Sequence, residues 1–380
     1  MLIDSTLREG AQAYGVYFGE GAKRRMAELL SAAGVDELEC GWMGQPGLEE
    51  FLAWAAGALP ALAPGGTDAQ GPALSVWCPC READAKAAAK LAQGGLISRL
   101  NIGAPSSALH REKRLGLGLP EMLARIGSVV GAARSDGATY ISVGLEDISR
   151  ADPDEALALA RAAVAAGAAR VRLSDTVGLL TPLSTAALVR RFVAELPVPV
   201  ALHAHNDMGM AAANAVTALQ CGASFVDVSA LGLGERAGIA PLEQVAAWLA
   251  RQNGSQGRRY DLSHLRALCL LAAQAAKTTV SRHRPVVGED IFAAESGIHV
   301  HGLLRDPALF EPFAPETVGA TRRMAVGAKS GGAAVAAAAE RLGVAPGTPP
   351  GADADRLDRV RAQAQRLGRP LTDKELLAVL

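Results

Sequence analysis

The stretch VPVALHAH, residues 198–205, is a short apolar run that ends in two histidines two positions apart. Its composition predicts a β-strand over Val198–His203. Side chains alternate between the two faces of a strand, so His203 and His205 should point the same way from its carboxyl end. Neutral imidazole is a good ligand for divalent zinc, manganese, iron or cobalt. Without a third ligand, the two residues are equally compatible with a surface or hydrogen-bonded histidine pair.

Seven other segments resemble this strand in being short and rich in Val, Ile and Leu, as buried parallel strands are. The segments between them have helical periodicity, and Asp152 and Thr181, each followed by proline, are typical helix starts. This alternation predicts an α/β fold, a (β/α)8 TIM barrel over residues 1–254. A doubly wound sheet is the alternative, but no Gly-x-Gly-x-x-Gly follows the first strand. The other predicted strands are Leu2–Ser5, Glu37–Gly41, Ala73–Trp77, Arg99–Ile102, Tyr140–Val143, Arg170–Leu173 and Phe225–Ser229.

The composition fits an intracellular enzyme, and we expect a cytoplasmic location. Of 380 residues, 49% are hydrophobic and the net charge is −1, so no bulk attraction to nucleic acid or membrane is expected. We see no secretory signal at the amino terminus and no uncharged apolar stretch long enough for a transmembrane helix. The five cysteines are odd in number and are expected to be free thiols, with Cys78 and Cys80 as a weaker candidate metal pair.

The strand–helix pattern ends at the linker-like sequence NGSQG, residues 253–257. A helix over 262–277 and a loop-rich stretch follow. We expect residues 255–342 to form a mostly helical lid or subunit-contact region over a barrel mouth, the subunit's own or a partner's. Residues 343–380 are expected to form a Gly-, Pro- and Ala-rich linker, over 343–355, and a short helical tail.

Polar residues are dense where the predicted strands end. In a TIM barrel these ends share one rim, at which active sites form. A single polar residue there could be a structural ion pair or a cap, but six such strand ends favour a common site. The clusters are DSTLREG at 4–10, Glu39, Glu146-Asp147, SDT at 174–176, HAHND at 203–207 and GLGER at 232–236.

Motifs along the chain resemble the isopropylmalate/homocitrate synthase family of TIM barrels. The resemblance extends over the whole chain and is greatest to homocitrate synthases of the nitrogen-fixation type. It is specific for the family and much less specific for the substrate. The motifs are DSTLREGAQ at 4–12, EDISRAD at 146–152, HAHND at 203–207, GLGERAG at 232–238, ESGIH at 295–299 and LTDKELL at 371–377.

The resemblance implies a metal-dependent Claisen-type condensation of acetyl-CoA with a 2-oxo acid, followed by thioester hydrolysis that releases CoA. It implies that Glu9, His203 and His205 hold the divalent ion (zinc, manganese, magnesium, iron or cobalt), a ligand set that leaves positions free for a chelating 2-oxo acid. Arg8 would support negative charge on the reacting oxygens, with a barrel-mouth salt bridge as the alternative. Thr176 would hydrogen-bond the substrate carboxylate, with a turn-stabilising hydroxyl as the alternative.

The resemblance also implies that Glu146 and His299 form the acid/base pair that removes a proton from the acetyl methyl group. Which of the two takes the proton stays open, and His299 could instead be a structural histidine. In the family the lid region reaches across to a neighbouring barrel, which implies a homodimer with lid exchange.

Several positions depart from the family pattern. Ile239 stands where many relatives carry asparagine, and isoleucine cannot bind a metal. In the lid, Ala294 and Lys329 replace histidines and Ala328 replaces a lysine, while Ala11 stands where glutamate is common. These changes leave the expected metal ligands intact but put the identity of the oxo acid in doubt.

We expect 2-oxoglutarate as the acceptor and homocitrate as the product. Oxaloacetate is the second choice, because one methylene is worth only about 1–3 kcal/mol of discrimination. Citramalate and isopropylmalate formation come third. Two other classes stay open: an acyl-CoA lyase, although residues 290–330 lack the cysteine expected of a lyase lid, and a non-catalytic barrel.

Overall fold

The computed structural model describes residues 1–60, 71–252, 260–345 and 352–380. It divides into two compact units, Met1–Val280 and Ser281–Leu380. The predicted linker at 253–257 lies outside the described residues, as do residues 346–351 of the linker predicted at 343–355.

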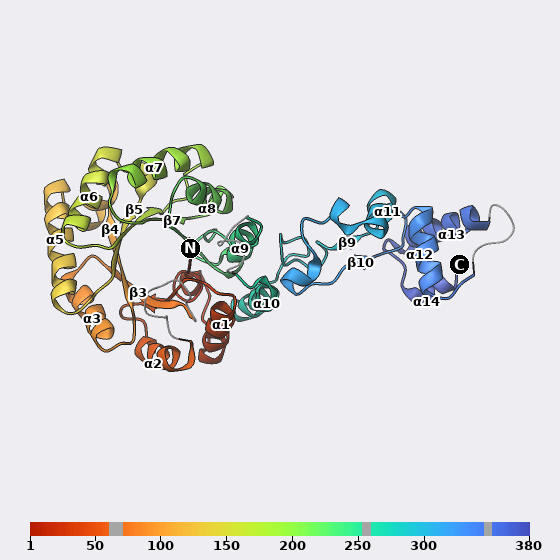
Figure 1. The fold of residues 1–380 in the computed structure, drawn as a ribbon, viewed down its shortest axis with the longest axis horizontal. Coiled ribbons are helices and arrows are strands. Elements are labelled where there is room, and N and C mark those ends of the chain that lie inside the picture. Colours follow the sequence, from red (N-terminus) through yellow and green to blue (C-terminus); the bar gives the residue numbers. More distant parts are fainter. Residues whose placement is uncertain (61–70, 253–259, 346–351) are drawn as a thin grey trace. The chain divides into compact units, whose positions relative to one another are not determined.

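Eight parallel strands close into a barrel in sequence order, which confirms the predicted TIM barrel (Figure 1). β1 (Leu2–Asp4) pairs with β2 (Glu37–Trp42) on one side and with β8 (Phe225–Val228) on the other, so the sheet has no free edge. The remaining strands are β3 (Ala73–Pro79), β4 (Arg99–Pro105), β5 (Ile141–Glu146), β6 (Arg170–Asp175) and β7 (Val200–Ala204).

Strands β3 to β6 each continue two or three residues beyond their predicted ends. Parallel pairing persists there: Pro105 is in register with Glu146, and Glu146 with Ser174. Glu146 is therefore the last residue of a strand, held by the sheet, rather than part of the loop that follows.

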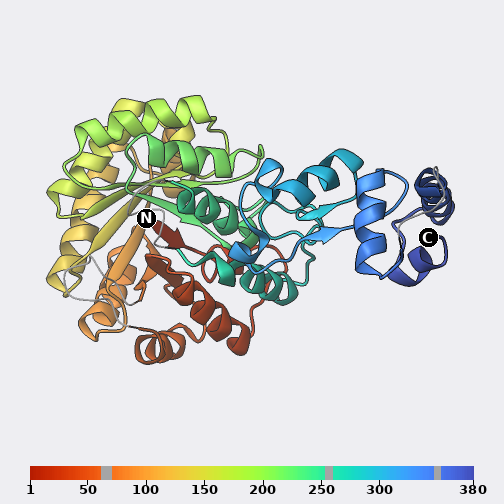
Figure 2. The same cartoon turned by 45° about the vertical axis from the view of Figure 1, so that its right-hand side comes forward.

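Helices surround the strands (Figure 2). At the starts of α6 (Pro153–Ala165) and α7 (Pro182–Glu195), the side chains of Asp152 and Thr181 accept hydrogen bonds from first-turn N–H groups, as their sequence predicts. The other helices of this unit are α1 (Glu20–Ala32), α2 (Leu48–Ala58), α3 (Glu82–Gln93), α4 (Ala108–His110), α5 (Leu119–Ser135), α8 (Ala211–Gln220), α9 (Leu242–Ala250) and α10 (Leu265–Ala275). Short 3-10 or π-helical turns are η1 (Gly10–Gln12), η2 (Arg111–Leu115), η3 (Ile148–Arg150), η4 (Ala230–Gly232) and η5 (Leu262–His264).

Charged side chains occupy much of the barrel interior. Arg172 of β6 is in register with Ala201 of β7, and Asp227 of β8 with Ile3 of β1, while Val171 and Leu173 alternate to the opposite face. TIM barrels more often fill these layers with branched apolar residues. The buried polar residues of the interior include Glu37, Glu39, Ser75, Asn101, Ser142, Arg170, Arg172 and Asp227.

The first unit extends beyond the predicted barrel boundary at residue 254, because α10 packs against α1. The second unit has its own apolar core, formed by Val326, Val335, Ala338, Val360, Ala364, Leu371 and Leu376. Its elements are β9 (Ala293–Ala294), α11 (Gly297–Arg305), η6 (Pro307–Leu309), η7 (Pro315–Val318), β10 (Arg323–Met324), α12 (Gly332–Arg341), α13 (Ala352–Leu367) and α14 (Asp373–Leu377).

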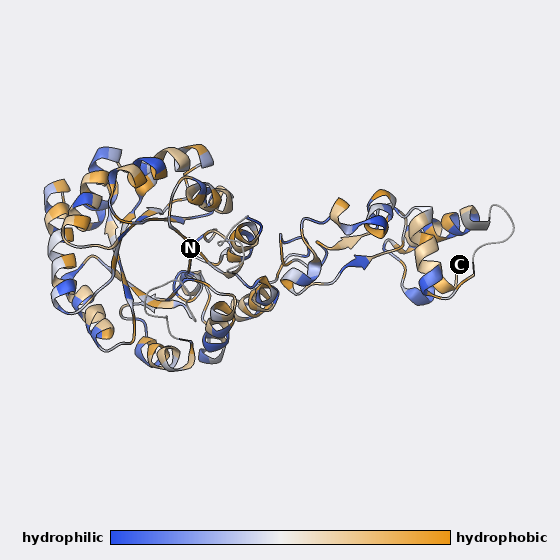
Figure 3. Cartoon of the chain, in the orientation of Figure 1, coloured by the Kyte–Doolittle hydropathy of each residue, from blue (hydrophilic) through white to orange (hydrophobic). Residues whose placement is uncertain are grey.

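Helices around the barrel carry both hydrophilic and hydrophobic residues (Figure 3). Within the described ranges, no single helix combines the length and hydropathy needed to cross a membrane. A bent pair, Ala108–Leu115 and Leu119–Ser135, meets the length and composition limits only when the two are taken together, and they meet at 79°. Met122, Ile126, Val129 and Val130 of this pair are buried in the first unit.

Candidate functional site

Glu9, His203 and His205 come together at the carboxyl ends of β1 and β7. The Nε2 atoms of the two imidazoles lie 3.3 Å apart, and each lies 3.9 Å from a carboxylate oxygen of Glu9. All three residues are buried, and their ligand atoms fall within 4.8 Å of one another. The histidine pair therefore has a third potential ligand within reach, from almost two hundred residues earlier in the chain.

Neighbouring groups orient these side chains. The Asp227 carboxylate lies 2.7 Å from Nδ1 of His203, which favours the proton on Nδ1 and leaves the Nε2 lone pair facing Glu9. The backbone N–H of Glu235 donates to Glu9 at 3.2 Å. Gly234 permits this approach, because a Cβ at that position would lie 2.9 Å from Cγ of Glu9.

The charge states of the cluster suit a cation. Burial, reinforced by the adjacent His203, lowers the pKa of His205 to about 3, so this ring is neutral at pH 7. Burial alone would raise the pKa of Glu9, but the charge of Arg8 and the two imidazoles outweigh it and lower that pKa to about 2. An ionised carboxylate and two imidazoles fit a divalent transition-metal ion, with positions left for further oxygen ligands.

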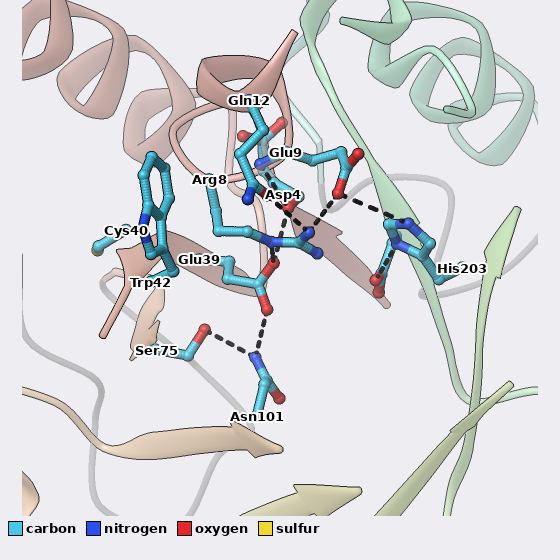
Figure 4. Close-up of polar contacts among 12 residues, drawn as sticks. Asp4, Arg8, Glu9, Gln12, Glu39, Cys40, Trp42, Ser75, Asn101 and His203 are labelled. Carbon is cyan, nitrogen blue, oxygen red and sulfur yellow. Dashed lines mark hydrogen bonds and ion pairs between the residues drawn. The ribbon is translucent and has the colours of Figure 1, made fainter. Parts of the chain in front are cut away.

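Arg8 lies between two carboxylates beside this cluster (Figure 4). Its Nε donates to Glu39 at 2.6 Å, and its Nη1 pairs with Glu9. The guanidinium also lies 6.0 Å from the ring of Trp77. Arg8 thus forms the barrel-mouth salt bridges that were the alternative to a role in catalysis. It also lines the adjoining cavity.

A cavity of about 380 Å³ opens above these groups within the barrel unit. Gly103 and Gly144 line the cavity without a side chain. At position 103 a Cβ would lie 2.6 Å from side-chain atoms of both Glu146 and Trp77. The cavity contains six of the seven residues that the sequence predicted for the site, all except His299. Residues that line it include Arg8, Glu9, His110, Arg114, Glu146, Arg172, Thr176, His203 and His205.

Thr176 and Glu146 lie on the cavity wall and already have protein partners. The Thr176 hydroxyl accepts the backbone N–H of Asp147 at 2.9 Å, the turn-stabilising role considered above. Arg114 donates to Glu146 at 2.7 Å. Both side chains remain in contact with the cavity, so these bonds are compatible with substrate binding.

His299 lies on α11 of the second unit, where its ring stacks on Phe310 at a centroid distance of 4.4 Å. It lines a separate cavity formed by residues of that unit. Of the altered lid positions, Lys329 forms an ion pair with Glu295 at 3.6 Å, and Ala294 lies in β9.

Three residues at or beside the site, Arg172, Asp227 and Arg114, were not predicted from the sequence. The local signal for the first two was charge within a predicted strand: Asp227 is the one charged residue of FVDV, and Arg172 alternates with Arg170 in RVRL. Arg114 lies beyond the end of β4, on η2, with no motif to mark it.

Comparison with known proteins agrees with this architecture. The model of the HMGL-like family matches residues 1–271, and that of the homocitrate synthase post-HMGL domain-like family matches residues 286–376. A homocitrate synthase of Frankia alni is 40% identical over 90% of this chain and 93% of its own length. Homocitrate synthase 1 of a Nostoc strain is 38% identical over 99% of this chain and 96% of its own length.

Other relatives carry different names. 2-Isopropylmalate synthase 2 of Caldanaerobacter subterraneus is 35% identical over 99% of this chain and 94% of its own length. The crystal structure of a Bacillus subtilis HMG-CoA lyase superposes with a TM-score of 0.61 at 22% identity, over 75% of this chain and 97% of that one, and supports the fold alone.

The chain belongs to the HMGL-like family, in the group that also carries the homocitrate synthase post-HMGL domain. It is an enzyme, an acyltransferase-type synthase related to the homocitrate synthases along nearly its whole length.

Proposed function

We propose that this enzyme condenses acetyl-CoA with 2-oxoglutarate and hydrolyses the resulting thioester to give homocitrate and CoA. The observation that carries the proposal is the buried Glu9–His203–His205 cluster beside Arg8, at one end of the barrel cavity. The relatives named homocitrate synthase support the same reaction class.

The proposed chemistry distributes the roles among the residues of the cavity and lid. Glu9, His203 and His205 would hold the divalent ion, which supplies Lewis acidity toward the oxygens of the 2-oxo acid. Glu146 and His299 would move the proton that leaves the acetyl methyl group, after which the new carbon–carbon bond forms at the ketone carbon. Arg8 would stabilise negative charge on the ketone oxygen until that oxygen is protonated. Water then cleaves the thioester, and CoA leaves.

A second cationic group favours an acceptor with two carboxylates. Arg114 lines the cavity together with Arg8 and Thr176, and its guanidinium, which pairs with Glu146 at 2.7 Å, would also bind a second substrate carboxylate. Pyruvate and 2-oxoisovalerate have no second carboxylate to use it. Oxaloacetate has one, and is shorter than 2-oxoglutarate by a single methylene, so it remains the second candidate.

A thiol-release assay with acetyl-CoA and four oxo acids tests the proposal. We expect 2-oxoglutarate to give the highest turnover, ahead of oxaloacetate, pyruvate and 2-oxoisovalerate. A chelator should abolish turnover and a divalent ion should restore it. An equal or higher rate with oxaloacetate would overturn the choice of acceptor.

Two other functions would give different results in the same assay. An acyl-CoA lyase would cleave hydroxyacyl-CoA and release no thiol in the condensation direction. A non-catalytic barrel would bind metal but release no CoA with any oxo acid. The cytoplasmic location, the homodimer with lid exchange and a link to nitrogen fixation stay predictions.

A further inference from the structure

A chain of alternating charges runs through the barrel interior from Arg8 to His203. Arg8 Nε donates to Glu39 at 2.6 Å, and the other oxygen of Glu39 lies 3.1 Å from Nη1 of Arg172. The same Nη1 lies 3.1 Å from Oδ2 of Asp227, which lies 2.7 Å from Nδ1 of His203. Arg172 is therefore the link between the carboxylate that holds Arg8 and the carboxylate that orients a predicted metal ligand.

The hydrogen bonds of Arg172 are incomplete in a way that stability alone does not explain. Its Nε and Nη2 are buried and, within the described part of the chain, have no hydrogen-bond partner. Buried ion pairs are costly, and apolar residues of similar volume are often as stable or more so. A barrel interior selected for stability alone would not favour an arginine bonded through one nitrogen.

Arg170, two residues earlier on the same face of β6, provides the contrast. Its Nε donates to Ser142 at 3.0 Å, and its Nη1 and Nη2 donate to Glu37 at 2.7 and 3.0 Å. Nη2 also reaches Asn101 at 2.9 Å. Arg170 has every nitrogen paired and does not line the cavity, whereas Arg172 does.

We infer that Arg172 is a positioning residue: it holds Glu39 and Asp227 so that Arg8 faces the cavity and His203 presents Nε2 to a metal ion. This inference rests on the metal site of the proposed function. Partners that orient a metal-bound histidine typically change metal affinity by about 10- to 100-fold when they are removed. Arg172 acts one contact further away, through Asp227, so we expect an effect near the lower end of that range.

The test is Co²⁺ binding to the metal-free full-length protein, followed by visible absorption and equilibrium titration. We expect Arg172→Met to raise the Co²⁺ dissociation constant about 10-fold. Arg170→Met is the matched control, because it removes an interior arginine whose hydrogen bonds and ion pair go to Ser142, Glu37 and Asn101 and not to Asp227; it should lower the melting temperature and leave the dissociation constant within about twofold. Arg172→Lys keeps one cation between the two carboxylates and should restore part of the affinity.

A double variant separates positioning from general damage. If Arg172 acts through Asp227, then Arg172→Met combined with Asp227→Asn should lose no more affinity than the weaker-binding single variant, within about twofold. Wild-type-like Co²⁺ affinity in Arg172→Met would overturn the inference, as would an equal loss in Arg170→Met. If Arg172→Met does not fold, Arg172→Lys with unchanged affinity overturns it instead. No Co²⁺ binding by the wild type would end the proposed metal site and this inference together.

Discussion

Glu9 is the single residue on which the proposed metal site most depends. Among the residues that the structure describes, it is the only carboxylate within 4 Å of both imidazoles, and it also pairs with Arg8. Its position on the turn after β1 is held by the N–H of Glu235, from the loop after β8. One side chain thus joins the opening strand of the barrel to its last two.

Glu9→Gln should lose bound metal and turnover together. The amide keeps the size of the side chain but removes the negative charge that favours a cation, and it places an N–H₂ group among the ligands. Metal content after dialysis and CoA release measure the two effects. Glu20→Gln, at a largely exposed glutamate of α1, is the control. Wild-type metal content in Glu9→Gln would contradict the ligand assignment.

His299→Ala should retain metal and lose turnover, because the proposed role of His299 is proton transfer rather than metal binding. His301→Ala is the matched control, since His301 is an exposed histidine on the same helix, α11. Both variants are assayed for metal content and CoA release. Normal turnover in His299→Ala removes this residue from the mechanism.

Among the elements, β2 and β6 supply a fully buried ion pair in the barrel interior, between Glu37 and Arg170. The Glu37 carboxylate is fully buried and is bonded by Arg170 at 2.7 and 3.0 Å and by Arg99 at 2.7 Å. Burial alone would raise the pKa of Glu37, but these guanidinium groups outweigh it and hold that pKa well below its usual value of 4.5. The pairing therefore contributes stability above about pH 4.5 that is lost as the pH falls toward the folded-state pKa.

Glu37→Gln should lower the free energy of unfolding at pH 7 by about 3–5 kcal/mol, because it leaves Arg170 buried with its charge unpaired. Below pH 4.5 the variant should also lose less stability on further acidification than the wild type. Urea midpoints at the two pH values test both effects, with the surface variant Glu28→Gln as control. Equal midpoints for Glu37→Gln and wild type at pH 7 would show that the pair contributes nothing.

At the scale of the whole molecule, the predicted site residues are not confined to one unit. The predicted residues divide between the units: six line the barrel cavity and His299 lies on α11. The family resemblance implies that His299 acts at the barrel of a partner subunit. This arrangement requires a dimer and predicts complementation between two inactive variants.

Mixing Glu9→Gln and His299→Ala subunits should restore activity if lids are exchanged. In a hybrid dimer, the barrel with intact Glu9 would receive intact His299 from its partner, while the other barrel would lack both. Random reassortment after mild unfolding and refolding should give about a quarter of wild-type turnover, since half of the dimers are hybrids with one working site each. No recovery in a mixture shown to contain hybrids would mean that His299 acts within its own subunit.

Much of the fold could be predicted because its signals are local. All eight strands were located from short apolar runs, and α6 and α7 from Asp152 and Thr181. Strand ends were predicted too early in β3 to β6, because pairing with neighbouring strands extends them through residues such as Pro105 and Glu146 that carry no strand signal of their own. Propensity describes one segment, whereas pairing depends on two.

The sequence by itself determined the barrel and the two histidines at the end of β7, since alternation along one strand fixes which side chains share a face. The family resemblance grouped Glu9 with them, but only the tertiary structure decided how closely Glu9 approaches the two imidazoles and that Arg172 connects Glu39 with Asp227. The physical reason is that closing a barrel brings strands from both ends of the chain together, and the register between strands, rather than any local pattern, sets which charges meet inside.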